Sequence, residues 1–255
     1  MQRGPVFPAS TMAYSNHDIS KFDCQASVVL SADGKLGAVL HDWRIEPREY
    51  ARHEERRGRR HAFETITPER TALVVIDMVA FFVEANEYAR GIVPNITVLA
   101  DALRERHGMV AWVVPSTAPP LAARREFFGE VVAERYRTSG GVGPPRGRLW
   151  HELRVAEADV VVEKSAPSAF FAGGSTLSEA LDARDIDTVI IVGTVANVCC
   201  ESSVRDASAL GYRVIMVADA NAALRDEDLN ATLHTVYRSF GDVRPTHEVV
   251  GMIGS

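Results

Sequence analysis

The chain has 255 residues, and its 28 Lys and Arg residues against 34 Asp and Glu residues give a formal net charge of −6. A hydrophobic fraction of 46% and a charged fraction of 24% are typical of globular proteins and exclude a fully disordered or collagen-like chain. The length predicts one domain with an appendage, or two small domains, with an ample buried core. The acidic balance argues against nucleic acid or an anionic membrane as the main partner.

Cysteine usage and hydropathy indicate the expected cellular location of the protein. No apolar run approaches the roughly 20 residues that a membrane helix needs, so we expect no membrane partner. The first residues lack a basic start followed by a continuous apolar stretch, which argues against a secretory signal. Cys24, Cys199 and Cys200 do not form a disulfide framework. We therefore expect a cytoplasmic protein with free thiols.

Residues 1–66 differ in pattern from the rest and are interpreted as an N-terminal extension or arm. Two short strands are expected in it, at Ala26–Leu30 and Leu36–Leu40, on either side of an Asp-Gly turn. The highly charged segment Glu46–Arg60 resembles a nucleic-acid patch at first sight. Acidic residues interleave its arginines, however, and we interpret it as a solvated helix or arm.

From Thr71 onward, apolar runs alternate with amphipathic segments. Five uninterrupted apolar runs and a short sixth one are expected to be strands: Ala72–Ile76, Met109–Val114, Val160–Val162, Thr188–Val192, Arg213–Val217 and Asp242–Val243. Runs of this kind mark strands that are buried on both faces, as in parallel sheets.

Helices are expected between these strands, at Ile92–His107, Thr176–Arg184, Cys199–Leu210 and Asp226–Ser239. Thr176 begins a capping-box pattern with Glu179, Asp226 is the expected cap of its helix, and Gly211 marks a helix end. The alternation predicts an α/β fold for residues 67–255. That fold is a doubly wound, mostly parallel six-stranded sheet, Rossmann-like in its three layers.

Three chemically active side chains fall where these strands end, which is where such sheets bind ligands. Asp77 follows the first strand, Lys164 lies two residues past the third, and Cys199 follows the fourth. Only three of the 28 cations are lysines, and after Thr71 the only lysine is Lys164, which suggests a need for a compact ammonium. Each residue also has a structural reading, such as a turn-forming Asp or a small buried Cys.

Together the three residues make a coherent acyl-transfer site. A thiol attacks as the thiolate, and a helix N-terminus with a nearby ammonium favours that anion. Asp77 is placed to accept the proton of the thiol and to deliver it to a leaving amine. Backbone N–H groups of the Gly193–Cys199 turn are candidates for an oxyanion hole. Spacing by itself does not choose between Cys199 and Cys200 as the nucleophile.

Short motifs around these residues resemble the signatures of the isochorismatase-like cysteine hydrolase superfamily. The resemblance covers about residues 67–253 and rests on four segments: Leu73–Met78 (LVVIDM), Lys164–Phe170 (KSAPSAF), Gly193–Cys199 (GTVANVC) and Glu201–Ala207 (ESSVRDA). It implies a catalytic triad of Asp77, Lys164 and Cys199, and so selects Cys199 over Cys200. It also implies a cis peptide between Thr194 and Val195, with the N–H groups of Val195 and Cys199 in the oxyanion hole.

Departures from the family pattern narrow the expected activity. Val79–Phe82 (VAFF) stands where members commonly have Gln-Asn-Asp-Phe, which makes this wall of the pocket more apolar. The Asp-x-His metal pattern of nicotinamidases is absent, so we expect no metal and no cofactor. Isochorismatases proper lack the cysteine, so Cys199 disfavours vinyl-ether hydrolysis.

The remaining branch consists of metal-free amidohydrolases that act on N-carbamoyl, ureido, amide or lactam compounds, including streptothricin hydrolases. The resemblance thus implies a small-molecule amide or lactam substrate and a homodimer or homotetramer. Candidate pocket residues are Phe81, Arg90, Trp112 and Phe171, with Arg137 and Arg148 as further candidates for an anion clamp. Two alternatives stay open: a vinyl-ether hydrolase that uses Asp77 without the thiol, and a non-catalytic regulatory member of the fold.

Overall fold

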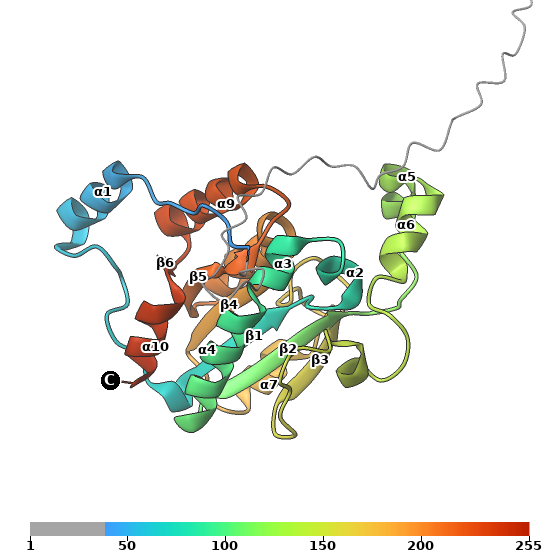
Figure 1. Cartoon of the computed structure of the whole chain (residues 1–255), viewed down its shortest axis with the longest axis horizontal. Helices are drawn as coiled ribbons and strands as arrows, with labels where there is room; N and C mark the ends of the chain where they lie inside the picture. Colours follow the sequence, from blue (N-terminus) through green and yellow to red (C-terminus); the bar gives the residue numbers. More distant parts are fainter. Residues whose placement is uncertain (1–38, 255) are drawn as a thin grey trace, which may run out of the picture.

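The computed structural model describes residues 39–254, and its centre is a six-stranded, all-parallel sheet (Figure 1). The strand order is β3-β2-β1-β4-β5-β6, so the direction of winding reverses between β1 and β4. The strands are β1 Thr71–Ile76, β2 Met109–Pro115, β3 Val160–Lys164, β4 Thr188–Thr194, β5 Arg213–Ala222 and β6 Asp242–Arg244. All six predicted strands and the doubly wound sheet are confirmed.

Helices cover both faces of the sheet and enclose two hydrophobic cores. α4 and α10 pack on one face, while α7, α8 and α9 pack on the other. The helices are α1 Pro47–Arg57, α2 Ala80–Val83, α3 Glu87–Gly91, α4 Val93–Glu105, α5 Ala122–Phe128, α6 Glu130–Arg137, α7 Leu177–Asp182, α8 Glu201–Ala209, α9 Asp226–Ser239 and α10 Thr246–Gly254. Shorter helical turns are η1 Pro68–Arg70, η2 Pro145–Arg148 and η3 Ala196–Cys200. Within the described residues, no helix has the length and apolar character needed to span a bilayer.

Burial of β1 on both sides explains its uninterrupted apolar sequence. Ala72, Val74 and Ile76 belong to one core, and Leu73 and Val75 to the other. Successive side chains of a strand point to opposite faces, so a strand covered on both faces has no polar positions. This central strand delivers the residue that follows it, Asp77, to the edge of the sheet where the direction of winding reverses.

Two predicted helix caps are wrong although the helices themselves are present. Thr176 makes no capping hydrogen bond, and the Leu177 N–H is instead bound by the Ser175 hydroxyl at 3.2 Å. Asp226 is the first residue of α9 rather than its cap. Its carboxylate accepts a hydrogen bond from His41 Nδ1 at 2.6 Å. The Asp226 side chain, which the local pattern assigned to the cap of α9, thus binds His41, a residue distant in sequence.

The described part of the N-terminal extension packs on the α/β domain. Ala26–Leu30 lies outside the described residues, and Val39 and Leu40 belong to no strand. The helix predicted within Glu46–Arg60 is present as α1, with a mostly solvated surface. Its His53 is buried and contacts the carbonyl of Tyr237 on α9 at 3.1 Å. The stretch from His41 to α1 therefore lies along the α9 layer, and Figure 1 shows α1 beside α9, whereas Val39, Phe63 and Ile66 pack with the core on the opposite face of the sheet.

His41 fixes the start of this segment near the end of β5. Its Nδ1 bonds Asp226, and its Nε2 accepts the Ala223 N–H at 3.1 Å. Its ring stacks on Tyr88, with 3.7 Å between ring centroids. Because an N–H donor faces Nε2, the ring is neutral with its proton on Nδ1. Burial lowers the pKa of His41, against the opposing effect of Asp226.

We expect the stabilising contribution of His41 to disappear in mild acid. Its folded-state pKa lies below the unfolded value of about 6.5, so the unfolded chain binds the extra proton first and stability falls as the pH falls through that range. Urea unfolding should show His41→Gln to be less stable than wild type by about 2 kcal/mol near neutral pH. This difference should shrink at about pH 5.5. A difference independent of pH would contradict the assignment, and the exposed His151→Gln is the control.

Candidate active site

Asp77 directly follows β1 in a conformation that turns its side chain to the sheet edge. Its φ of 53° lies in the left-handed region, which Asp tolerates better than most residues. Hydrogen bonds hold this turn on both sides: the Asp77 N–H donates to Val113 O at 2.9 Å, and the Val79 N–H donates to Asp77 O at 2.8 Å. The carboxylate is buried, with 1% of the side chain exposed.

Lys164 is the last residue of β3 and connects the other two candidates. Its Nζ lies 2.9 Å from Asp77 Oδ2 and 3.5 Å from Cys199 Sγ. It also donates to Ala166 O at 3.1 Å. β3 and β1 are separated by β2 in the sheet, so the ammonium reaches across a strand. The fold therefore brings together three residues that are far apart in the sequence.

A glycine allows β4 to approach β1 closely at the site. Gly193 has a φ of 118°, and a Cβ there would lie 2.2 Å from Ile76 O, the carbonyl just before Asp77. No larger residue fits this contact. The next peptide, between Thr194 and Val195, is cis, as the family resemblance implied.

Cys199 lies in a wide helical turn rather than at the start of a regular helix. In η3 the Cys200 N–H donates to Val195 O at 3.3 Å, a π-type bond, and the regular helix α8 begins only at Glu201. Cys200 is fully buried in the core under the sheet, whereas Cys199 is partly buried at the edge of that core. Adjacent helical residues point about 100° apart, so the turn presents Cys199 to Lys164 and buries Cys200.

The electrostatics favour a protonated thiol next to an ion pair. Burial raises the pKa of Cys199 to about 12, and the Asp77 carboxylate adds to this shift while Lys164 opposes it. Burial also raises the pKa of Asp77, against the effect of Lys164. Burial favours the neutral amine of Lys164, yet Asp77 and Cys199 outweigh it and raise its pKa. Lys164 favours the thiolate, as expected from the sequence, but desolvation and the Asp77 carboxylate outweigh it.

The predicted pocket residues divide into exposed and buried ones. Phe81 on α2 is 38% exposed, and Phe171, which follows Lys164 in a loop, is 58% exposed. Trp112 is wrong as a pocket residue. Its side chain is 0% exposed in the middle of β2, and its indole N–H donates to Asp159 Oδ2 at 2.8 Å. A mid-strand residue in a sheet covered on both faces becomes part of the core.

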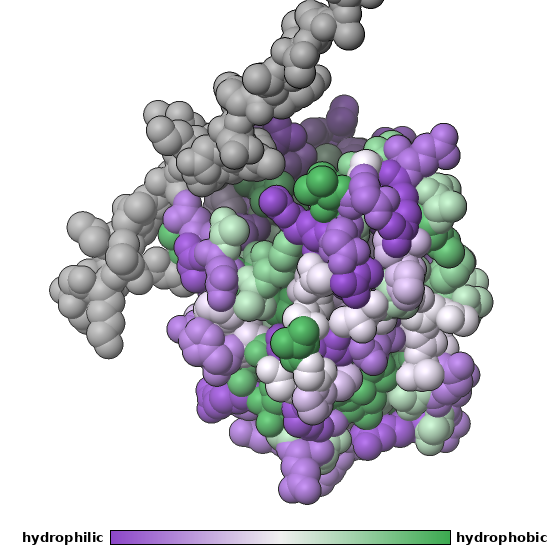
Figure 2. All heavy atoms as spheres, turned by 90° about the vertical axis from the view of Figure 1, so that its right-hand side faces the viewer, coloured by the Kyte–Doolittle hydropathy of each residue, from purple (hydrophilic) through white to green (hydrophobic). Residues whose placement is uncertain are grey.

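An apolar surface continues from Phe81 onto the helical hairpin of α5 and α6. The ring of Tyr136 on α6 lies 6.2 Å from that of Phe81 and 5.2 Å from that of Phe128. Further exposed apolar side chains in or beside this hairpin are Leu121, Phe127, Val131, Val132 and Val142. Figure 2 faces the side on which Figure 1 draws α5 and α6, and apolar side chains reach the surface there in several areas.

The candidate anion-binding arginines all have partners of their own. Arg90 donates to the carbonyls of Val83 and Glu84 at the end of α2. Arg137 bonds Glu134 on its own helix at 2.8 Å. The buried Arg148 donates to Glu163 Oε1 at 2.5 Å and to Pro115 O at 3.3 Å. Arg148 Nε is buried without a hydrogen-bond partner, but all three guanidinium groups make the contacts above, so an anionic substrate would compete there with protein carboxylates and carbonyls.

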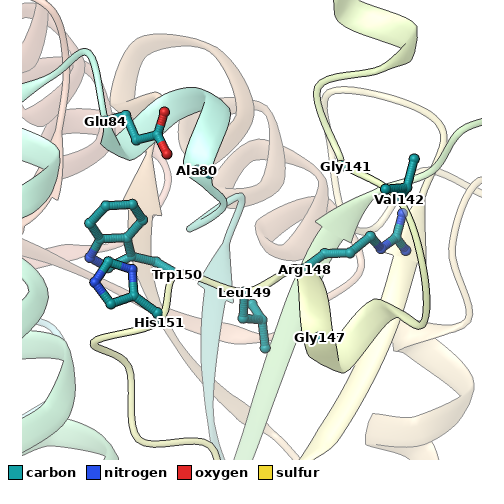
Figure 3. Close-up of a pocket in the computed structure, with 9 residues that line it drawn as sticks. All are labelled: Ala80, Glu84, Gly141, Val142, Gly147, Arg148, Leu149, Trp150 and His151. Atoms are coloured by element: carbon teal, nitrogen blue, oxygen red, sulfur yellow. The ribbon is translucent and has the colours of Figure 1, made fainter.

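Two cavities flank Arg148 beside the strand ends. One, of about 310 Å³, is lined by the α2 residues Ala80 and Glu84 together with Gly141, Val142 and the segment 147–151 (Figure 3). The other, of about 460 Å³, is lined by Thr117, Arg137, Thr138, Gly141, Val142, Gly143, Pro145, Arg148 and Glu163. Arg90 and Cys199 line neither of them.

Apart from Arg148, which was a candidate for an anion clamp, sequence reasoning missed the segment 147–151 that lines these cavities. Backbone contacts bring it to the site: Val79 pairs with Leu149 in an isolated bridge, and the Trp150 N–H donates to Met78 O at 2.8 Å. In Figure 3 the Arg148 side chain points toward Val142, while Trp150 and His151 lie at the opposite end of the segment.

The described residues contain no cluster of His, Cys, Asp and Glu side chains suited to a metal ion. His41 and His53 attach the N-terminal segment to the domain through their hydrogen bonds. The Asp77, Lys164 and Cys199 arrangement offers one base, one cation and one thiol. Such a set suits nucleophilic chemistry at a carbonyl carbon.

We expect Asp77→Asn to make the Cys199 thiol more reactive, because the carboxylate raises the thiol pKa. Lowering the thiol pKa by one unit gives about tenfold more thiolate near neutral pH, but each thiolate is about threefold less nucleophilic. The rate of alkylation by iodoacetamide should therefore rise about threefold for each unit by which the pKa falls. Lys164→Met should slow it. Slower alkylation in Asp77→Asn would refute this assignment, and Glu163→Gln, beside Lys164 but outside the triad, is the control.

Comparison with known proteins agrees with this geometry. Residues 71–248 match the family model of the isochorismatase domain. The chain is 30% identical to the uncharacterized isochorismatase family protein YwoC of Bacillus subtilis (strain 168), over 72% of this chain and 95% of that protein. It is 27% identical to the ureidoacrylate amidohydrolase RutB of Agrobacterium fabrum (strain C58 / ATCC 33970), over 74% of this chain and 92% of that protein.

A solved structure shows the same architecture. The cysteine hydrolase from Pseudomonas syringae pv. phaseolicola 1448A superposes with a TM-score of 0.67 at 30% identity, covering 76% of this chain and 96% of that one. The family match spans every strand of the sheet and the three residues of the candidate site. The chain belongs to the isochorismatase family.

Proposed function

We propose that this protein is a cysteine-dependent amidohydrolase that cleaves a C–N bond of a small amide, ureido or lactam compound through a thioester on Cys199. The observation that carries the proposal is the position of the Lys164 ammonium, within 2.9 Å of Asp77 and 3.5 Å of the Cys199 sulfur. The similarity to a relative named as a ureidoacrylate amidohydrolase supports the reaction class.

In the acylation half-reaction, Asp77 accepts the proton of the Cys199 thiol as the sulfur attacks the substrate carbonyl carbon. The carbonyl electron pair moves onto oxygen, and we assign the N–H groups of Val195 and Cys199 as its hydrogen-bond donors. When this pair returns, the C–N bond breaks. The leaving nitrogen takes the proton from Asp77, and a thioester remains on Cys199.

Hydrolysis of the thioester reverses the proton transfers. Asp77 removes a proton from a water molecule, and the resulting oxygen attacks the thioester carbonyl carbon. Collapse breaks the C–S bond, releases the carboxylic or carbamic acid, and returns the proton to the sulfur. The electrostatics fit this cycle, since a thiol with a pKa near 12 needs a base in contact with it, and burial strengthens Asp77 as that base.

The surroundings of the site support an uncharged substrate with apolar surface. Val79–Phe82 is apolar, and the exposed rings of Phe81 and Phe171 offer stacking surface near the strand ends. Arg90, Arg137 and Arg148 are engaged elsewhere. We therefore favour an amide or lactam that carries an apolar substituent over a small dicarboxylate.

The proposal predicts that hydrolysis depends on Cys199 and not on its neighbour. Release of ammonia or amine should be measured on a panel of primary amides, N-carbamoyl compounds, ureido acids and lactam antibiotics. Cys199→Ala and Asp77→Asn should each lower kcat/KM by at least about 100-fold on any substrate that wild type turns over. Cys200→Ala, which changes a buried core thiol, should keep most of the activity.

Mass spectrometry of the quenched reaction should show an acyl group on Cys199. Turnover that survives Cys199→Ala but not Asp77→Asn would instead assign acid chemistry such as vinyl-ether hydrolysis to Asp77. No turnover of any panel member, together with a Cys199 thiol that alkylates at the same rate in wild type, Asp77→Asn and Lys164→Met, would favour a non-catalytic member of the family.

A further inference from the structure

A buried serine on α8 connects the cysteine turn to the lysine loop. The Ser203 side chain is 0% exposed. Its hydroxyl donates to Cys199 O at 2.7 Å and accepts the Ala169 N–H at 2.9 Å. A hydroxyl has one proton, and the amide of Ala169 already supplies a donor, so the hydroxyl proton is directed to the Cys199 carbonyl. The Ser203 hydroxyl thus links the Cys199 carbonyl to the Ala169 amide.

Ala169 belongs to a loop that carries the catalytic ammonium at its base. Lys164 pairs with Ser175 in an antiparallel bridge, and the Ser165 N–H donates to Gly174 O at 2.8 Å, which closes the loop. On the far side of the loop, Ala169 is buried, whereas Phe171 projects to solvent. The base of the loop is thus held by the sheet, and its tip is held by Ser203.

The other end of the Ser203 contact is the wide turn that presents the thiol. In this turn the Cys200 N–H reaches back five residues to Val195 O, so the hydrogen bonding departs from that of a regular helix. The Ser203 hydroxyl binds the carbonyl of the nucleophile residue itself. Removing this hydroxyl would leave a buried carbonyl and a buried amide without that partner, at the two elements that hold Sγ and Nζ together.

We propose that Ser203 is a positioning residue that sets the separation of the Cys199 sulfur from Lys164 and Asp77. It touches no substrate and acts through the backbone of Cys199 and Ala169. The inference rests on the proposed function for its importance to catalysis. Its effect on the thiol, however, can be measured without any substrate.

The chain offers a matched control whose hydroxyl binds the same helix, α8. Thr232 on α9 is also buried, and its hydroxyl donates to Glu201 Oε2 at 2.7 Å, in the first turn of α8. Thr232→Val removes a buried hydroxyl that binds α8, yet leaves the link to the lysine loop intact. A merely structural role for Ser203 would make Ser203→Ala and Thr232→Val alike.

The test compares Ser203→Ala, Ser203→Thr and Thr232→Val in the full chain. The rate of Cys199 carboxamidomethylation by iodoacetamide is followed across pH by peptide mass spectrometry, and thermal unfolding is followed alongside. We expect both hydroxyl deletions to lower Tm. Only Ser203→Ala should change the alkylation rate of Cys199, by about fivefold or more, and displace its pH profile by at least about half a unit. Ser203→Thr, which keeps the hydroxyl, should stay within about twofold of wild type.

Equal alkylation profiles for folded Ser203→Ala and wild type would overturn the proposal, as would equal changes in Thr232→Val. If Ser203→Ala does not fold, the isosteric pair Ser203→Thr and Ser203→Val decides in the same way, since the two differ by the hydroxyl. Where a substrate is found, kcat should fall in Ser203→Ala with KM little changed. An altered thiol without any turnover in the amide panel would refute the amidohydrolase and keep the positioning role.

Discussion

The structure depends on one buried ion pair, between Asp77 and Lys164, that joins two strands lying on either side of a third. Burying two charges costs desolvation free energy, and their mutual attraction offsets this cost only when the geometry is good. Here Lys164 Nζ lies 2.9 Å from Asp77 Oδ2. Removing one partner would leave the other charged group buried without compensation, which typically costs about 3–5 kcal/mol. The pair also sets the state of the thiol, because the carboxylate favours SH and the ammonium favours S⁻.

Backbone contacts bring the Cys199 sulfur next to this ion pair. Gly193 lets β4 lie against the carbonyl that precedes Asp77, and the wide turn after it presents Cys199 while Cys200 fills the core. Ser203 then ties that turn to the loop of Lys164. The result is a thiol with a raised pKa held next to a strengthened base. In the proposed mechanism such a thiol stays protonated at rest and is activated when Asp77 accepts its proton.

The N-terminal segment adds a second layer of support at the same edge of the sheet. His41 binds the backbone just after β5 and the first residue of α9, and α1 packs against α9 through His53. Glu201 in the first turn of α8 is in turn held by Thr232 of α9. The segment that precedes the family domain thus packs on α9, and α9 contacts α8, the helix that follows Cys199.

The sequence by itself determined the strands and predicted the three candidate residues at their ends. Continuous β-branched runs predict doubly buried strands, and the carboxyl ends of parallel strands meet at one edge, so Asp77, Lys164 and Cys199 follow from local pattern and motif. Tertiary structure decided the rest. Trp112 became core, Asp226 bound His41 rather than its helix end, and the arginines found carboxylates and carbonyls. The partner of Ser203 and the high pKa of Cys199 also depend on contacts and desolvation between segments distant in sequence, which no local periodicity encodes.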